Sequence, residues 1–406
     1  MTPNIDYSKF CCPNPSCKFY AKKNSQNIKH RSWTGRHKNI QRLKCIVCEK
    51  EFSSRCGTIL ARSSLPVDKT TRIMKYFRWG VPDHATADIC EVDPDTVAAV
   101  RLRTCERAKI HHDNEAQGIQ DPAAQVDELY VRMGGKSSCW LAASILVSSL
   151  FIVAACLGAR NQHMADCVIA ETHLRCSWLR ALFTDGWQCY LGAIMRCFGQ
   201  IYRPRRQSLQ GPRPKHRLKV TSILYAQVVK ICDASYKLIG IQARSWIGSM
   251  KECLGWVKLF KIGTKIHTAH IERFWGTFRC HQPFARRRTR CWVKSKTSCE
   301  ARTWVWISLY NWVIIHTSLT INGIRRTPAM AAGLTDHVFS YEEYVLLPVF
   351  AHTNFQERLQ QHLAHMNSTE IVQAASRTSL KKETSMMWEK PADAKTNLII
   401  KERALC

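Results

Sequence analysis

Two pairs of cysteines close to the N-terminus are the first residues of the chain with metal-binding chemistry. Four residues separate Cys12 from Cys17, and two separate Cys45 from Cys48. Pairs spaced in this way can place four thiolates around one tetrahedral ion, so we expect a structural Zn²⁺ site. Residues 1–60 are too few to bury a large core, and bound metal would supply much of their folding energy. The alternative is four unrelated cysteines in a chain that contains 20.

Three carboxylates form a second candidate site. Asp127 lies in a segment that is typical of a strand, Asp185 ends a buried strand, and Glu272 lies near the start of a helix. Carboxylates from such elements can converge on two Mg²⁺ or Mn²⁺ ions, which stabilise the attacking and leaving oxygens of phosphoryl transfer. The neighbouring Glu128 is expected on the other face of its strand, so Glu128→Gln should be much milder than loss of the other acids. Spacing alone does not select three acids from the 31 in the chain.

Basic residues outnumber acidic ones, with 60 Lys and Arg against 31 Asp and Glu and a formal net charge of +29. The ordinary hydrophobic content, 45%, excludes a wholly disordered or fibrous chain. Two runs without acids, residues 196–220 and 286–296, contain Arg205, Arg206, Arg286, Arg287 and Arg288. One basic run could be a solvated face or a targeting signal, but three separated basic runs, the third over residues 1–60, favour a long polyanion such as double-stranded DNA.

Residues 71–109 show a helix-turn-helix pattern. Helices are expected over residues 71–78 and 84–90, and a third begins with Asp93 as N-cap and Pro94 in its first turn. Ala85 and Ile89 are expected to face inward. The residues expected nearest base edges are Asp95, Thr96 and Ala99, and the basic residues expected to remain exposed are Arg101, Arg103, Arg107 and Lys109. The alternative is an ordinary three-helix bundle with a solvated basic face.

Residues 140–158 are mostly apolar and long enough to cross a bilayer. Ser148 and Ser149 interrupt them, and β-branched residues lie on either side. This pattern favours two short buried strands joined by a turn over a membrane span. Elsewhere we expect an exposed basic loop over residues 203–216, strands over 217–262 and helices over 268–315.

Several blocks of the sequence resemble insertion-sequence transposases of the DDE class, most closely the IS one type. The similarity covers residues 10 to about 345. Its blocks are residues 12–17, Val126 to Leu129, Thr184-Asp185-Gly186-Trp187, residues 270–279 and residues 326–334. The chain departs from the family at Trp275, where Asn is usual.

The resemblance implies an RNase H-like α/β core in which Asp127, Asp185 and Glu272 are catalytic and bind Mg²⁺. It also implies DNA cleavage and joining at the terminal repeats of an element. We therefore expect a zinc module (residues 1–60), a helix-turn-helix domain (61–118), the catalytic domain (119–350) and a loosely ordered tail (351–406). The protein is expected in the cytoplasm with the nucleoid, as a homo-oligomer on DNA. The alternatives are a non-catalytic DNA-binding regulator and a decayed transposase copy.

Overall fold

The computed structural model describes residues 6–35, 39–134, 138–206, 210–235, 237–384 and 388–389. An eight-stranded mixed sheet forms the centre of the fold, with the order β16-β13-β12-β9-β5-β6-β7 and with β17 also paired to β13. Its strands are β5 (Ala123–Arg132), β6 (Ser138–Leu146), β7 (Ile152–Gly158), β9 (Ala181–Thr184), β12 (Leu224–Cys232), β13 (Leu238–Ile247), β16 (Glu383–Thr384) and β17 (Trp388–Glu389). The overall class is therefore α/β, as expected.

Strands β5, β6 and β7 form an antiparallel meander, and β9 and β12 run parallel to β5. The β6–β7 pair confirms the predicted hairpin, because Trp140 pairs with Gly158 and Ser144 with Ala154. Among the described residues, none of the helices is both long enough and apolar enough to cross a membrane.

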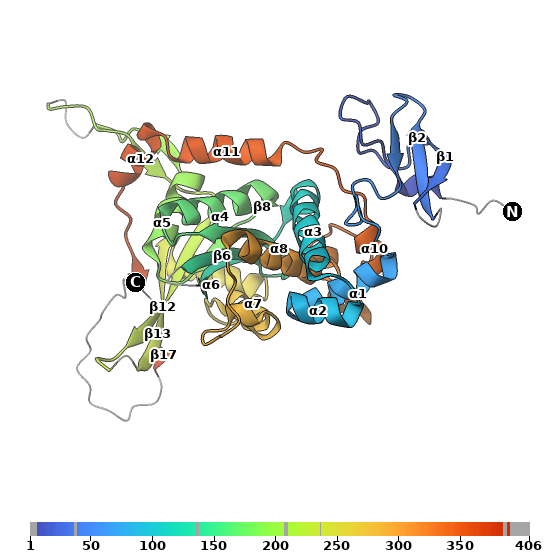
Figure 1. The fold of residues 1–406 in the computed structure, drawn as a ribbon. Coiled ribbons are helices and arrows are strands. Elements are labelled where there is room, and N and C mark those ends of the chain that lie inside the picture. The colour runs from blue at the N-terminus through green and yellow to red at the C-terminus, as the bar shows by residue number, and fades with distance from the viewer. Residues whose placement is uncertain are drawn as a thin grey trace.

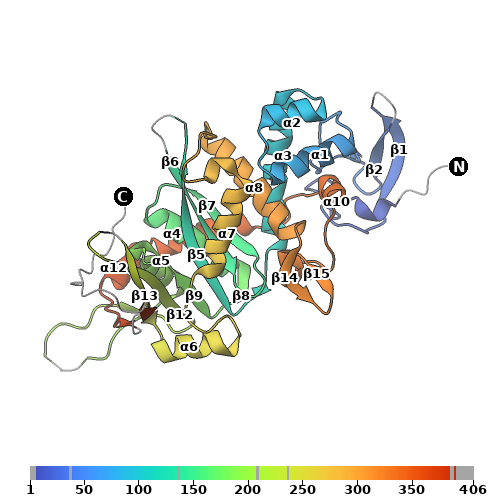
Figure 2. The same cartoon turned by 90° about the horizontal axis from the view of Figure 1, so that it is seen from below.

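Helices cover both faces of this sheet (Figure 2). On one face lie α4 (Gln162–Arg175) and α5 (Gln188–Phe198), which connect β7 to β9 and β9 towards β12. On the other face α7 (Ala269–His281) packs on β5 and β6 with Ile271, Phe274 and Phe278 buried. The central α8 (Lys296–Trp312) follows and is buried over most of its length.

One segment expected to form strands contains a helix. Within residues 217–262, β11 (Arg217–Lys219), β12 and β13 agree with the prediction, but α6 (Met250–Leu259) does not. A capping box starts this helix, because Ser249 and Glu252 each bond to the other's backbone N–H. The Ser-x-x-Glu pattern that marks the start was present in the sequence.

The predicted helix-turn-helix region forms α1 (Val67–Arg78), α2 (Asp83–Cys90) and α3 (Pro94–Glu115). Asp93 caps α3 by accepting a hydrogen bond from the Asp95 N–H, which confirms the predicted start. These helices share one hydrophobic core with the large sheet. Gly80 turns the chain between α1 and α2 at a φ of +65°, and a Cβ there would meet the backbone of His281 at the end of α7.

The N-terminal segment has its own small core and a three-stranded antiparallel sheet, which Figure 1 shows at one end of the molecule. Its elements are the 3-10 helix η1 (Tyr7–Lys9), β1 (Ile28–Thr34), β2 (Ile40–Cys45) and β3 (Glu51–Ser53). Tyr20 connects it to the C-terminal part of the chain, because its hydroxyl donates to the Ala351 carbonyl at 2.9 Å.

The range predicted as a loosely ordered tail begins with two packed helices, α11 (Phe355–Met366) and α12 (Thr369–Ser376). Phe355 and Met366 are fully buried, so α11 belongs to the main core. Residues 385–387 and 390–406 of that range lie outside the described residues. The remaining short elements are β4 (Ile119–Gln120), β8 (Cys176–Trp178), β10 (Gln200–Tyr202), η2 (Pro283–Ala285), β14 (His316–Ile321), β15 (Ile324–Arg326), α9 (Pro328–Ala331) and α10 (Tyr341–Leu346).

Candidate active site and metal centres

Two of the predicted catalytic acids lie together at the end of a strand. Asp185 directly follows β9, and Asp127 lies on the neighbouring β5 one residue past Val126, which pairs with Thr184. Oxygens of Asp127, Glu128 and Asp185 all lie within 4.8 Å of one another. The structure therefore brings Asp127 and Asp185 together and adds Glu128 to them.

Glu128 reaches this group from the other side of its strand. Its carboxylate accepts hydrogen bonds from Arg160 Nε at 2.7 Å and from the Tyr190 hydroxyl of α5 at 2.8 Å. These contacts agree with the expected opposite face, but the acid is not remote from the site. The physical reason is the length of β9: it ends at Thr184, so no strand lies beside residues 127 and 128 on that side, and side chains from both faces approach Asp185.

Glu272 lies on α7, outside that group. Its side chain is 48% exposed and forms an ion pair with Lys230 Nζ of β12 at 3.3 Å. It is nevertheless near enough to Asp127 to contribute to the raised pKa of that acid. Burial raises the pKa of Asp185 and the charge of Lys230 opposes that rise, so this lysine acts on both the strand acid and the helix acid.

Gln125 holds the start of α7 beside Asp127. Its Oε1 accepts hydrogen bonds from the backbone N–H groups of His270 and Ile271 at 2.9 and 3.1 Å, and its Nε2 donates to the His267 carbonyl at 2.8 Å. Because alternate strand residues share a face, Gln125 and Asp127 both point towards α7. The sequence analysis did not identify Gln125, although its position two residues before Asp127 was a usable signal.

Burial and mutual repulsion raise the pKa values of the clustered acids. Burial, followed by the charge of Asp185, raises the pKa of Asp127 well above its ordinary value. Burial, followed by the charge of Glu128, raises the pKa of Asp185 to about 7. A divalent cation would relieve this repulsion, and carboxylate oxygens are the ligands that Mg²⁺ prefers. The residues present therefore fit such an ion.

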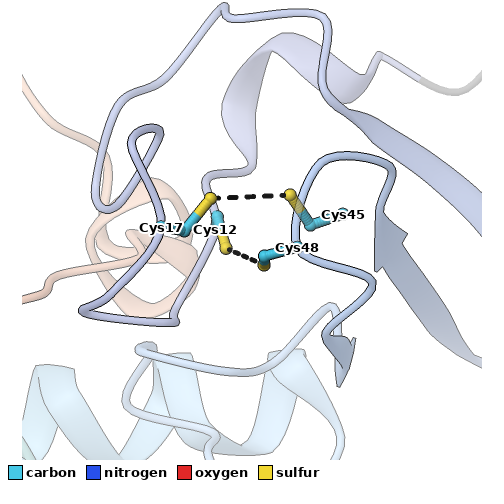
Figure 3. A group of neighbouring side chains, drawn as sticks. All are labelled: Cys12, Cys17, Cys45 and Cys48. Atoms are coloured by element: carbon cyan, nitrogen blue, oxygen red, sulfur yellow. Dashed lines mark hydrogen bonds between the residues drawn. The ribbon is translucent and has the colours of Figure 1, made fainter.

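The four predicted zinc ligands converge in the N-terminal module (Figure 3). The sulfurs of Cys12 and Cys48 are 3.5 Å apart, those of Cys17 and Cys45 are 4.0 Å apart, and all four lie within 4.8 Å of one another. A tetrahedral Zn²⁺ with Zn–S bonds of ~2.3 Å places its sulfurs about 3.8 Å apart. The group fits a metal such as zinc, which confirms the predicted clustering of these cysteines.

Local contacts favour the thiolate form of Cys48 within this cysteine group. The backbone N–H of Lys50 lowers the pKa of Cys48 to about 6, and the Asn27 amide donates to Cys45 Sγ at 3.2 Å. Burial acts in the opposite direction and raises the pKa of Cys12. A bound cation would offset that burial, because metal binding displaces the thiol proton.

The helix-turn-helix surface differs from the prediction at its basic residues. Arg101 is only 4% exposed, pairs with Asp83 of α2, and lies 3.9 Å from the ring centroid of Phe77. Burial lowers the pKa of Arg101 to about 10. The expected exposure of Arg101 is therefore wrong, because α3 uses this side chain to hold α1 and α2.

The other basic residues of α3 are also engaged within the protein. Arg103 donates to the Ile59 carbonyl at 3.0 Å, Arg107 donates to the Val349 carbonyl at 3.0 Å, and Lys109 pairs with Glu300 at 2.5 Å. Ile89, expected to face inward, is 48% exposed. The inward residues of α2 are Thr86, Ala87 and Cys90.

The remaining predicted DNA-contact residues lie at or near the surface. Asp95 is exposed at the start of α3, and Thr96 and Ala99 are half-buried there. The predicted basic loop connects β10 to β11, and Figure 1 shows it extending away from the sheet beside α12. The predicted phosphate-contact arginines are all exposed, and they are Arg205, Arg206, Arg286, Arg287 and Arg288. Residues 207–209 of the loop lie outside the described part of the chain.

No protein family matches the sequence, and no curated protein matches it significantly.

Proposed function

We propose that this chain is a DNA transposase of the DDE class, in which Asp127, Asp185 and Glu272 hold Mg²⁺ ions for strand cleavage and joining. The observation that carries the proposal is the approach of Asp127 and Asp185, whose oxygens lie within 4.8 Å of each other and of Glu128. Half-buried acids at this distance repel one another, and such an arrangement is commonly retained for a cation.

The strand order supports an RNase H-like core. Such a core has a three-stranded antiparallel meander followed by two strands that run parallel to the first and are connected through helices. Strands β5, β6 and β7 form such a meander, and α4 and α5 connect it to β9 and β12. In this arrangement Asp185 follows the carboxyl end of β9, and Asp127 lies on the adjacent parallel strand β5 just beyond that end, where ligands commonly bind in α/β sheets.

Each residue of the site would have a separate role in the reaction. Asp127 and Asp185 would bind the metals, and Glu272 would complete the site after exchanging its Lys230 partner for a metal. When bound, the metal pair supplies charge neutralisation and activates water for in-line phosphoryl transfer. Gln125 would keep α7, and with it Glu272, aligned with Asp127. No covalent protein intermediate is required, because positioning and charge neutralisation supply the catalysis.

The charge of the chain supports double-stranded DNA as the partner. The formal net charge is +29, and exposed arginines occupy the β10–β11 loop and the segment after α7. The turn between α2 and α3 leaves Asp95 exposed, and Thr96 and Ala99 lie along the next turn of α3. We therefore propose the N-terminal end of α3 for base contacts and the exposed arginines for phosphate contacts.

Strand cleavage tests this proposal. The substrate is a plasmid that carries the gene for this chain with its natural flanking DNA, incubated with Mg²⁺ or Mn²⁺. Wild-type protein should nick the plasmid at the element ends, and Asp127→Asn, Asp185→Asn and Glu272→Gln should each abolish nicking while DNA binding persists. Asp233→Asn, which changes a half-buried acid in the β12–β13 turn away from the cluster, is the matched control and should cleave normally.

In the same assay, Glu128→Gln tests whether Asp127 or Glu128 is the first metal ligand. The Glu128 carboxylate already accepts hydrogen bonds from Arg160 and Tyr190, so we expect that it does not bind the metal. Glu128→Gln should therefore retain residual cleavage. Complete loss in Glu128→Gln, with activity retained in Asp127→Asn, would make Glu128 the first metal ligand. DNA binding without cleavage by the wild type would instead favour the regulator or the decayed copy.

A further inference from the structure

A third group of metal-ligand side chains lies apart from the N-terminal cysteines and from the clustered acids. His173 on α4, Cys197 on α5 and His362 on α11 each place a ligand atom within 4.8 Å of the other two. The sulfur of Cys197 is 3.4 Å from His362 Nε2, and the two imidazole centroids are 5.4 Å apart. Three separate helices therefore contribute to one site.

The positions of these residues on their helices favour a cation. His173 lies in the last turn of α4, and Cys197 is the second-last residue of α5. The C-terminal end of a helix carries partial negative charge, so two such ends close together attract a positive ion. Helix α11 lies beside both, as Figure 1 shows, and buries Leu359 and Leu363 on either side of His362 in sequence.

The ligand types select the kind of ion. Two imidazole nitrogens and one thiolate suit Zn²⁺, whereas Mg²⁺ and Ca²⁺ prefer oxygen. With Zn–S of ~2.3 Å and Zn–N of ~2.0 Å, a tetrahedral zinc separates sulfur from nitrogen by about 3.5 Å. The observed Cys197–His362 separation of 3.4 Å is close to that value.

A hydrogen bond between Cys197 and His362 explains only part of the arrangement. Such a bond needs two residues, whereas the ring of His173 also lies against His362 and edge-on to Phe198 at a centroid distance of 4.7 Å.

We propose that His173, Cys197 and His362 bind a Zn²⁺ ion that fastens α11 to α4 and α5, with a fourth position open to water. Binding requires the Cys197 thiol to release its proton to solvent as the Zn–S bond forms. Helix α5 starts at Gln188, shortly after Asp185, so the ion would fix the far end of the helix that follows this acid. The site is independent of the proposed transposase activity.

Zinc content of the full-length protein tests the site. After removal of loosely bound metal, the wild type should carry about two equivalents of Zn²⁺, one at this site and one at the N-terminal cysteines. His362→Gln and His173→Gln should each lower the content by one equivalent. His365→Gln, one turn further along α11 and exposed, is the matched control and should retain the wild-type content.

Cobalt substitution identifies the ligands independently of zinc counting. The Cys45→Ser background removes the N-terminal site, so the remaining cobalt–thiolate absorption comes from Cys197 and should disappear in Cys45→Ser/Cys197→Ala. Circular dichroism of each variant checks that the helices persist. Wild-type zinc content in folded His362→Gln and His173→Gln, or unchanged cobalt–thiolate absorption without Cys197, would overturn the proposal.

Discussion

Replacement of Asp185 by Asn should stabilise the metal-free protein at neutral and alkaline pH. Asp185 accepts a hydrogen bond from the Trp187 N–H at 3.0 Å, which an Asn oxygen also accepts. Burial, with the charge of Glu128, raises the pKa of Asp185 to about 7, from an ordinary value of 3.8. The variant keeps the shape of the side chain and removes this titration.

The sign and size of the effect follow from linkage. Below about pH 4 the acid is protonated in both the folded and unfolded states, so its stabilising contribution is fully present. Between about pH 4 and 7 the unfolded state loses the proton first, and the free energy of unfolding falls as pH rises. A shift of about three pKa units corresponds to at most about 4 kcal/mol, reached above pH 7.

Urea unfolding without divalent ions measures the difference between the wild type and Asp185→Asn. The two should be equally stable near pH 4, and the variant should be more stable by about 2–4 kcal/mol near pH 8. Added Mg²⁺ should stabilise the wild type more than the variant. Glu272→Gln is the control, because it removes an acid that is 48% exposed and paired with Lys230. A stability difference that is the same at every pH would refute the reasoning.

Three further outcomes are expected. Trp275 is 1% exposed, so Trp275→Asn should cost about 3–5 kcal/mol in urea unfolding; wild-type stability would contradict this. Arg101→Ala should destabilise the fold by about 3 kcal/mol without changing the salt dependence of DNA binding. Arg205→Ala/Arg206→Ala should instead lower the slope of log affinity against log salt concentration by about two, without affecting stability. The reverse pattern would exclude the assigned roles. Burial lowers the pKa of His111 to about 3. Protonation of this histidine in the unfolded state should therefore lower the free energy of unfolding by about 1.4 kcal/mol for each pH unit below about 6.5. His111→Phe should remove this contribution from the pH dependence.

Features encoded by neighbouring residues could be predicted from the sequence. The hairpin over residues 140–158 and the start of α3 at Asp93 and Pro94 depend on local patterns, and both are confirmed. The spacing within each cysteine pair also predicted that the two pairs lie together, because a short turn brings the two sulfurs of a pair close to each other. Helix α6 was missed despite its capping box, since the apolar residues around it also fit strands.

Features that depend on distant partners could not be predicted. Arg101 looks like one more basic residue on an exposed helix face. Its burial depends on Asp83 and Phe77, which reach it from two other helices. In the same way, Phe355 and Met366 lie in polar surroundings in the sequence, and only the packing of α11 on the main core explains their burial.

Glu128 shows how a correct local rule can give an incomplete site. Strand alternation predicts that Glu128 and Asp127 point to opposite faces, and the contacts of Glu128 with Tyr190 on α5 agree. Alternation does not say where the neighbouring strand ends. Because β9 stops at Thr184, the end of the sheet is open beside Asp127, and acids from both faces meet Asp185 there. Together with burial, the charge of Glu128 then raises the pKa of Asp185. An acid that was expected to lie outside the site therefore changes the protonation of one of its members.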